Sequence, residues 1–181
     1  MVLIRMATPA DRDAVAALHT ANWQDAYRGL LPDAYLEGPL AADMQAAWAE
    51  KFADSAAGRS GVLVAEEDRL VAEEDRRLLG FIRIVPNADP RWGHYIDNLH
   101  VAAGGRGRGV GRTLFQAGAD WARTHGGAAG LYLYVYADNT PARAAYARWQ
   151  GREVEHFLDD APHGGKIPAV RVVWEAGAGV E

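Results

Sequence analysis

A loop of alternating glycine and arginine lies near the middle of the chain, at residues 105–113, where the sequence reads GRGRGVGRT. Glycines let a backbone approach a ligand closely, and this loop runs directly into a segment with helical spacing. The first amides of a helix are unpaired and positively polarised, so such a junction favours a phosphate group. The other interpretation is a solvated turn whose arginines face water, and the neighbouring residues decide between the two.

Two common phosphate-binding motifs are excluded by the spacing of these glycines. The dinucleotide-binding motif G-x-G-x-x-G, started at Gly107, ends on Arg112 where it needs glycine. The P-loop motif G-x-x-x-x-G-K-[ST], aligned on residues 111–113, has arginine in place of its lysine and Arg106 in place of its first glycine. The loop therefore belongs to neither class.

The segments around the loop carry strand and helix patterns. Alternating or continuous apolar runs predict strands over residues 2–6, 61–68, 78–86, 94–101, 131–137, 153–157 and 169–175. Helical spacing predicts a helix after Thr8 and Pro9, and others over 39–54, 110–126 and 139–151. The order β-α-α-β-β-β-α-β-α-β-β indicates an α/β (α+β) fold, in which about four helices flank a mixed, mostly antiparallel sheet of six to seven strands.

A short duplication lies between the second and third predicted strands. The residues LVAEEDR occur at 63–69 and again, unchanged, at 70–76. This period is too short for a solenoid, so we interpret the second copy as an insertion that lengthens a surface turn. Either copy can supply the strand edge.

The composition predicts one soluble globular domain over residues 1–181, with a loose tail at 176–181. The chain is 49% hydrophobic and 24% charged, and its net charge of -5 argues against a general nucleic-acid-binding surface. The absence of cysteine excludes disulfides and thiolate catalysis. No apolar run approaches the roughly 18 residues that span a bilayer. We therefore expect a cytoplasmic bacterial protein that binds neither nucleic acid nor membrane.

Two motifs resemble those of the GNAT superfamily of N-acyltransferases. Residues 99–115 are similar to its acyl-CoA-binding signature, an Arg or Gln followed by x-x-G-x-G or -A between a strand and a helix; the matching residues are Arg106, Gly109 and Gly111. Residues 139–151 are similar to a second motif of the family, Asn-x-x-Ala-x-x-x-Tyr with a later glycine; the matching residues are Asn139, Ala142, Tyr146 and Gly151. The first predicted strand and helix also resemble the family, so the likeness covers nearly the whole chain.

This resemblance implies direct transfer of an acetyl group from acetyl-CoA, without a metal, to a primary amine of a small molecule or peptide. It also implies that the backbone amides of residues 107–112 hold the pyrophosphate, while residues 99–101 pair with the pantetheine arm as if it were an added strand. The implied cofactor-binding residues are Leu99, His100, Val101, Arg106, Gly107, Arg108, Gly109, Val110, Gly111, Arg112 and Asn139.

Proton transfer requires an acid and a base beside the thioester. The resemblance makes Tyr146 the acid that protonates the departing sulfur. An alkylamine has a pKa of about 10.4, so a base must help to neutralise it, and Asp97 is the first candidate, acting with a raised pKa or through water. His100 titrates nearer neutral pH, but on a regular strand it points to the face opposite Asp97 unless a bulge intervenes.

Several further expectations concern the acceptor and the assembly. Trp23, Tyr27 and Tyr35 flank the connection between the first two helices, which in the family borders the acceptor site. The histidines lack the spacing of a metal site. A homodimer is expected only because members of the family often form one. An acyl-CoA-binding sensor or regulatory module without catalysis is the alternative to an enzyme.

Overall fold

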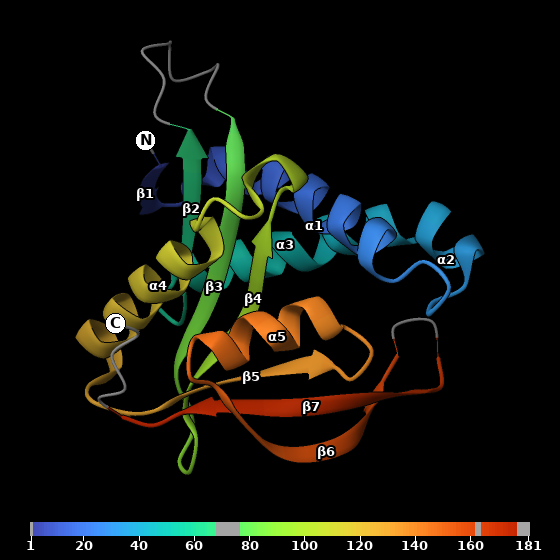
Figure 1. Cartoon of the computed structure of the whole chain (residues 1–181). Helices are drawn as coiled ribbons and strands as arrows, with labels where there is room; N and C mark the ends of the chain where they lie inside the picture. The colour runs from blue at the N-terminus through green and yellow to red at the C-terminus, as the bar shows by residue number, and fades with distance from the viewer. Residues whose placement is uncertain (1, 68–76, 162–163, 177–181) are drawn as a thin grey trace.

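One mixed sheet organises the part of the chain that the computed structural model describes, residues 2–67, 77–161 and 164–176. Its order is β1-β2-β3-β4-β5-β7-β6 (Figure 1). The strands are β1 Val2–Met6, β2 Gly61–Glu67, β3 Leu78–Asp89, β4 Gly93–Val101, β5 Leu131–Tyr136, β6 Arg152–Asp160 and β7 Lys166–Trp174. The helices are α1 Arg12–Ala26, α2 Asp33–Glu37, α3 Leu40–Ala56, α4 Val110–Gly126 and α5 Thr140–Arg148, with 3-10 turns at Pro9–Asp11 and Ala103–Gly105.

The predicted mixed, mostly antiparallel sheet is confirmed, because every neighbouring pair of strands except β4 and β5 is antiparallel. The short helix α2 lies in the connection between the first two predicted helices, for which the sequence predicts no helix. Residues 63–67, from the first copy of the duplicated stretch, form the end of β2. The second copy at 70–76 and residues 177–181 of the predicted tail lie outside the described residues.

Two apolar cores lie on opposite faces of the sheet, because side chains alternate along a strand. In β2, Leu63 and Ala65 join the core that also holds side chains of α4 and α5. Val62 and Val64 join the core beneath α1, α2 and α3. Figure 1 shows α4 and α5 on the near face and α1 and α3 on the far face. The sheet is thus covered on both sides.

The two central strands separate soon after they begin. The parallel strands β4 and β5 pair only at His94 with Leu131 and at Tyr95 with Tyr132. Beyond this point they run apart, as Figure 1 shows. The edge of β4 that would face β5 therefore lacks a partner strand and borders an opening within the sheet.

Candidate functional site

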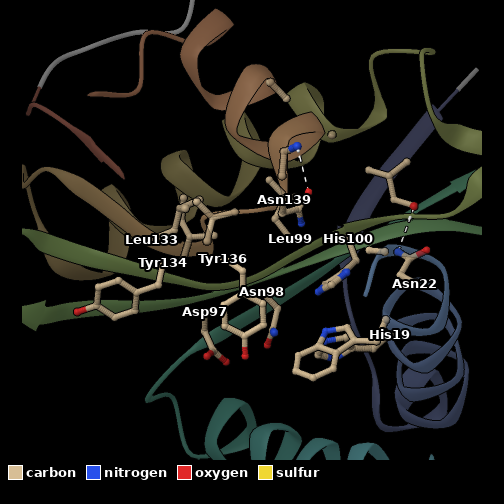
Figure 2. A pocket seen from close by; sticks show the side chains of 18 of the residues that line it. His19, Asn22, Asp97, Asn98, Leu99, His100, Leu133, Tyr134, Tyr136 and Asn139 are labelled. Atoms are coloured by element: carbon tan, nitrogen blue, oxygen red, sulfur yellow. Dashed lines mark hydrogen bonds between the residues drawn. The ribbon is translucent and has the colours of Figure 1, made fainter. Parts of the chain in front are cut away.

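The opening between β4 and β5 is continuous with a cavity of about 840 Å³ (Figure 2). The residues that line it come from α1, α3, β4, α4, β5, α5 and β6 and from the segments that connect them. Ten of the residues proposed from the sequence line this cavity: Trp23, Tyr27, Asp97, Leu99, His100, Val101, Arg106, Gly111, Asn139 and Tyr146. Tyr35 does not line it; its ring packs in the core beneath α1 and α3, and its hydroxyl donates to Asp43 at 3.1 Å. The predicted loop residues that are also outside the lining are Gly107, Arg108, Gly109, Val110 and Arg112.

The inner edge of β4 presents backbone groups to the opening. The N–H of Ala102 donates to the carbonyl of Leu79 on β3 at 2.8 Å. Hydrogen-bonding direction alternates along an antiparallel ladder, so the peptide groups of Val101 and Leu99 turn away from β3 and towards the opening. Asn22 of α1 donates to the carbonyl of Val101 at 3.1 Å, which leaves the N–H of Val101 to a ligand.

A β-bulge at Asp97 brings the two candidate bases to one side of the sheet. Asn98 lies opposite Arg83 and Ile96 opposite Ile84, so Asp97 is an extra residue in β4. The bulge breaks the regular alternation, and both Asp97 and His100 line the cavity. From the sequence, Asp97 and His100 are expected on the same side of the sheet only if a bulge intervenes, and the structure contains this bulge.

The carboxylate of Asp97 is held by two cations. Its Oδ2 accepts hydrogen bonds from Lys51 of α3 and, at 2.8 Å, from Arg83 of β3. Arg83 is 7% exposed and also donates to Asp54 at 3.1 Å. Asp97 therefore compensates a buried guanidinium, which gives it a structural task besides any catalytic one.

His100 belongs to a buried group of rings. Its imidazole lies 4.2 Å, centroid to centroid, from that of His19, whose Nδ1 accepts a hydrogen bond from Trp48 Nε1 at 3.0 Å. Burial lowers the pKa of His19 to about 2 and that of His100 to about 4, the latter against the opposing effect of Asp97. Neither ring nitrogen of His100 has a hydrogen-bond partner within the described residues, so its neutral ring has a free lone pair.

Helix α5 places Asn139 and Tyr146 on the opposite wall. Asn139 caps the helix, since its Oδ1 accepts from the N–H of Ala142 at 3.3 Å, and its Nδ2 donates to the hydroxyl of Tyr27 at 3.4 Å. Tyr146 lies about two helical turns further along α5, and its hydroxyl has no partner among the described residues. Burial raises the pKa of Tyr146 above its ordinary value, so this phenol keeps its proton at neutral pH.

Glycines shape the loop that leads into α4. Gly107 has a φ of +74° and Gly109 a φ of +79°, a region in which other residues are strained. A Cβ on Gly111 would meet the Trp149 ring at 3.3 Å and Val101 Cγ2 at 3.4 Å, so there is little room for a side chain at this position. The side chain of Val110 is buried in the core, so this residue can offer a ligand only its backbone.

The three arginines of the loop differ in their partners. Arg106 turns to α1, where it pairs with Asp25 at 2.7 Å and donates to Asn22 at 3.2 Å. Arg108 pairs with Glu67 at 3.1 Å. Arg112 has neither a hydrogen bond nor an ion pair in the described part of the chain. Of the three, Arg112 has the side chain that is free to meet an anion.

Several residues that line the cavity were not predicted from the sequence. They are His19, Asn22, Lys51, Asn98, Tyr136 and Asp159. His19 and Asn22 are 5% and 8% exposed, three residues apart on α1. Polar residues at this spacing on an otherwise apolar helix face are the signal that could have identified them.

The described residues offer neither a metal site nor a membrane-spanning helix. Residues 2–67, 77–161 and 164–176 contain no group of three or more His, Asp or Glu residues that could hold a metal ion. Among the described helices, none combines the length and the apolar character that a membrane crossing requires.

Comparisons with known proteins agree with this geometry. A family model described as the acetyltransferase (GNAT) family matches residues 20–151. A streptothricin acetyltransferase from Streptomyces lavendulae is 47% identical over 53 residues, which are 29% of this chain and only 28% of that relative.

Solved structures resemble the chain over almost its full length. The PaiA N-acetyltransferase of Thermoplasma acidophilum, in complex with coenzyme A, has a TM-score of 0.67 and 17% identity over 93% of this chain and 98% of that one. YncA, a putative acetyltransferase of Salmonella typhimurium with its cofactor acetyl-CoA, has the same TM-score and identity over 96% and 93%. At such low identity the likeness concerns the fold.

Proposed function

Because this chain belongs to the GNAT family of acetyltransferases, we propose that it moves an acetyl group from acetyl-CoA to a primary amine by direct transfer in a ternary complex. The observation that carries the proposal is the unpaired inner edge of β4, which opens into the cavity beside the glycine loop. A strand edge of this kind pairs with an extended amide-bearing chain, and pantetheine is such a chain.

The cofactor would bind along this edge and at the start of α4. In the proposal, the backbone amides of residues 107–112 hold the pyrophosphate, and Leu99 and Val101 pair with the pantetheine arm. Gly107 and Gly109 support this role, since their conformations are strained for other residues and a Cβ at either would meet no atom within 4 Å. Arg112 supplies the free positive side chain. Asn139, already engaged as a cap, borders the arm.

The reaction exchanges one bond for another at the acetyl carbon. The amine nitrogen attacks the carbonyl carbon, a C–N bond forms, and the C–S bond breaks. A backbone N–H of residues 99–101 stabilises the negative charge that develops on the carbonyl oxygen. Tyr146 donates its proton to the departing sulfur, and a base in the cavity takes the proton that the nitrogen loses.

We assign the base to His100 in preference to Asp97. The ring of His100 is neutral and has a free lone pair in the described structure. Asp97 accepts hydrogen bonds from Lys51 and Arg83 on its Oδ2, so this oxygen is already engaged by two donors. In this assignment Asp97 positions Lys51 and compensates Arg83.

The acceptor in this proposal is a small molecule or a peptide, with Trp23 and Tyr27 on the wall that it would contact. We further propose that the protein works in the cytoplasm of a bacterium, on the composition of the sequence alone. A homodimer remains a prediction from the family.

An amine panel tests the proposal. The purified chain is incubated with acetyl-CoA and one amine at a time, streptothricin included because of the relative's name, and free thiol is measured. We expect thiol release that depends on an amine, with a matching acetylated product by mass. Tight acetyl-CoA binding without thiol release for any amine would instead support the non-catalytic module.

A further inference from the structure

One wall of the cavity combines tyrosine rings with a carboxylate. Tyr95 of β4 and Tyr134 and Tyr136 of β5 line it, together with Asp159 of β6. Figure 2 shows Tyr134 and Tyr136 extending to the same side of the strands as Asp97. Asp159 shares a strand face with Phe157, whose ring lies 5.1 Å from that of Tyr134, so the carboxylate belongs to this tyrosine wall.

Asp159 has no cation to balance its charge in the described part of the chain. Its one hydrogen bond is local, from the N–H of Asp160 at 2.9 Å. Asp97 is paired with Lys51 and Arg83, and Asp160 with Lys166 at 2.6 Å; Asp138, which also lines the cavity, is exposed to solvent. A partly buried carboxylate without a counter-charge is costly, and a cationic ligand removes that cost.

The negative charge of Asp159 influences the neighbouring tyrosine side chains. Burial raises the pKa of Tyr136 to about 12, and the charge of Asp159 contributes to this rise. Tyr136 also contacts Tyr27, with ring centroids 5.2 Å apart, so the rings form a continuous wall from α1 to β5. Aromatic faces attract ammonium groups, most strongly where water is partly excluded.

We propose that the acceptor carries a second positively charged group, distinct from the amine that receives the acetyl group, and that this group binds Asp159 beside the rings of Tyr95 and Tyr136. The ring of Tyr134 already contacts a cation of the protein, Arg171, at 5.1 Å. The inference rests on the proposed acetyltransferase function and specifies its substrate class, a diamine or polyamine. The reacting nitrogen becomes neutral beside His100, while the second nitrogen keeps its proton and its charge. The distance from His100 to Asp159 therefore sets the chain length of the preferred diamine.

A comparison of paired amines tests this inference. Linear diamines of roughly three to eight carbons are each compared with the monoamine of equal carbon number, by kcat/KM from thiol release. We expect the wild-type protein to prefer the diamine by about tenfold or more at its best chain length. In Asp159→Asn the ratio of diamine to monoamine falls towards parity.

The matched control is Asp160→Asn. It removes the same charge from the next residue, which is exposed and paired with Lys166, and it should keep the wild-type ratio. If Asp159→Asn does not fold, Tyr136→Leu should lower the same ratio, whereas Tyr136→Phe, which keeps the ring, should preserve it. Monoamines used as well as diamines by the wild-type protein, or a ratio unchanged in Asp159→Asn, would overturn the inference. Absence of thiol release with every amine would overturn the proposed function itself.

Discussion

The imidazole of His19 lies against that of His100, with ring centroids 4.2 Å apart. Burial lowers the pKa of both, to about 2 and about 4, from an ordinary value of 6.5. Below pH 6.5 these two histidines therefore bind protons in the unfolded chain but not in the folded chain. Each such histidine lowers the free energy of unfolding by about 1.4 kcal/mol per pH unit as the pH falls from 6.5 to 4.

We accordingly expect His19→Gln to lose less stability than the wild type over this acidic range, because glutamine can still accept from Trp48 but does not titrate. The measurement is the melting temperature at several pH values. Parallel curves for the two proteins between pH 6.5 and 4 would show that His19 is not held neutral by the fold.

Tyr146→Phe should lower kcat by roughly tenfold and change the KM for acetyl-CoA much less. The phenol proton assists departure of a thiol whose pKa is about 8.5, already a fair leaving group, so the loss is moderate. Tyr35→Phe is the control, since its hydroxyl contacts Asp43 outside the cavity lining. An unchanged kcat in Tyr146→Phe would remove this residue from the mechanism.

Asp97→Asn should reduce the free energy of unfolding by about 3 kcal/mol, because Arg83 is buried and loses a charged partner. At temperatures where the variant is folded, its kcat should stay within about threefold of the wild type, whereas His100→Gln should lower kcat by about a hundredfold.

Asp54→Asn is the companion to this pair of variants, since it removes the other carboxylate of Arg83 at 3.1 Å without touching the cavity. Urea unfolding and steady-state kinetics measure the two effects. A folded Asp97→Asn protein with a larger loss of kcat than His100→Gln would reverse the assignment of the base.

Gly109→Ala should raise the KM for acetyl-CoA by about tenfold, because a residue strained at a φ of +79° displaces the amides that begin α4. Gly58→Ala is a matched control: its φ is +74°, a Cβ there also meets nothing within 4 Å, and it follows α3 rather than preceding α4. Both variants should lose about 1 kcal/mol of stability. Equal KM values for acetyl-CoA in the two would contradict a phosphate-binding role for the loop.

The loop and the cap of α5 could be predicted from the sequence because both depend on local chemistry. Positive φ at Gly107 and Gly109 follows from glycine in a tight turn, and Asn139 with Pro141 is a recognisable helix start. The succession of strands along the chain could likewise be predicted, since most of them have a clear apolar run.

The proposed base and its surroundings could not be predicted in the same way. The contacts of Asp97 with Lys51 and Arg83 join segments that are 46 and 14 residues away in the chain. The bulge that turns Asp97 and His100 to the same side is an irregularity of one residue, which no apolar pattern reports. Asp159 faces the cavity only because β6 lies beside β7 at the edge of the sheet.

The separation of β4 from β5 gives this sheet edges of two kinds. The outer edges, on β1 and β6, are at the ends of the sheet, where an unsatisfied strand invites pairing with any other chain. The inner edge of β4 instead faces the cavity. Backbone groups that would promote aggregation at an outer edge are thereby held where a ligand inside the molecule, rather than another protein chain, meets them.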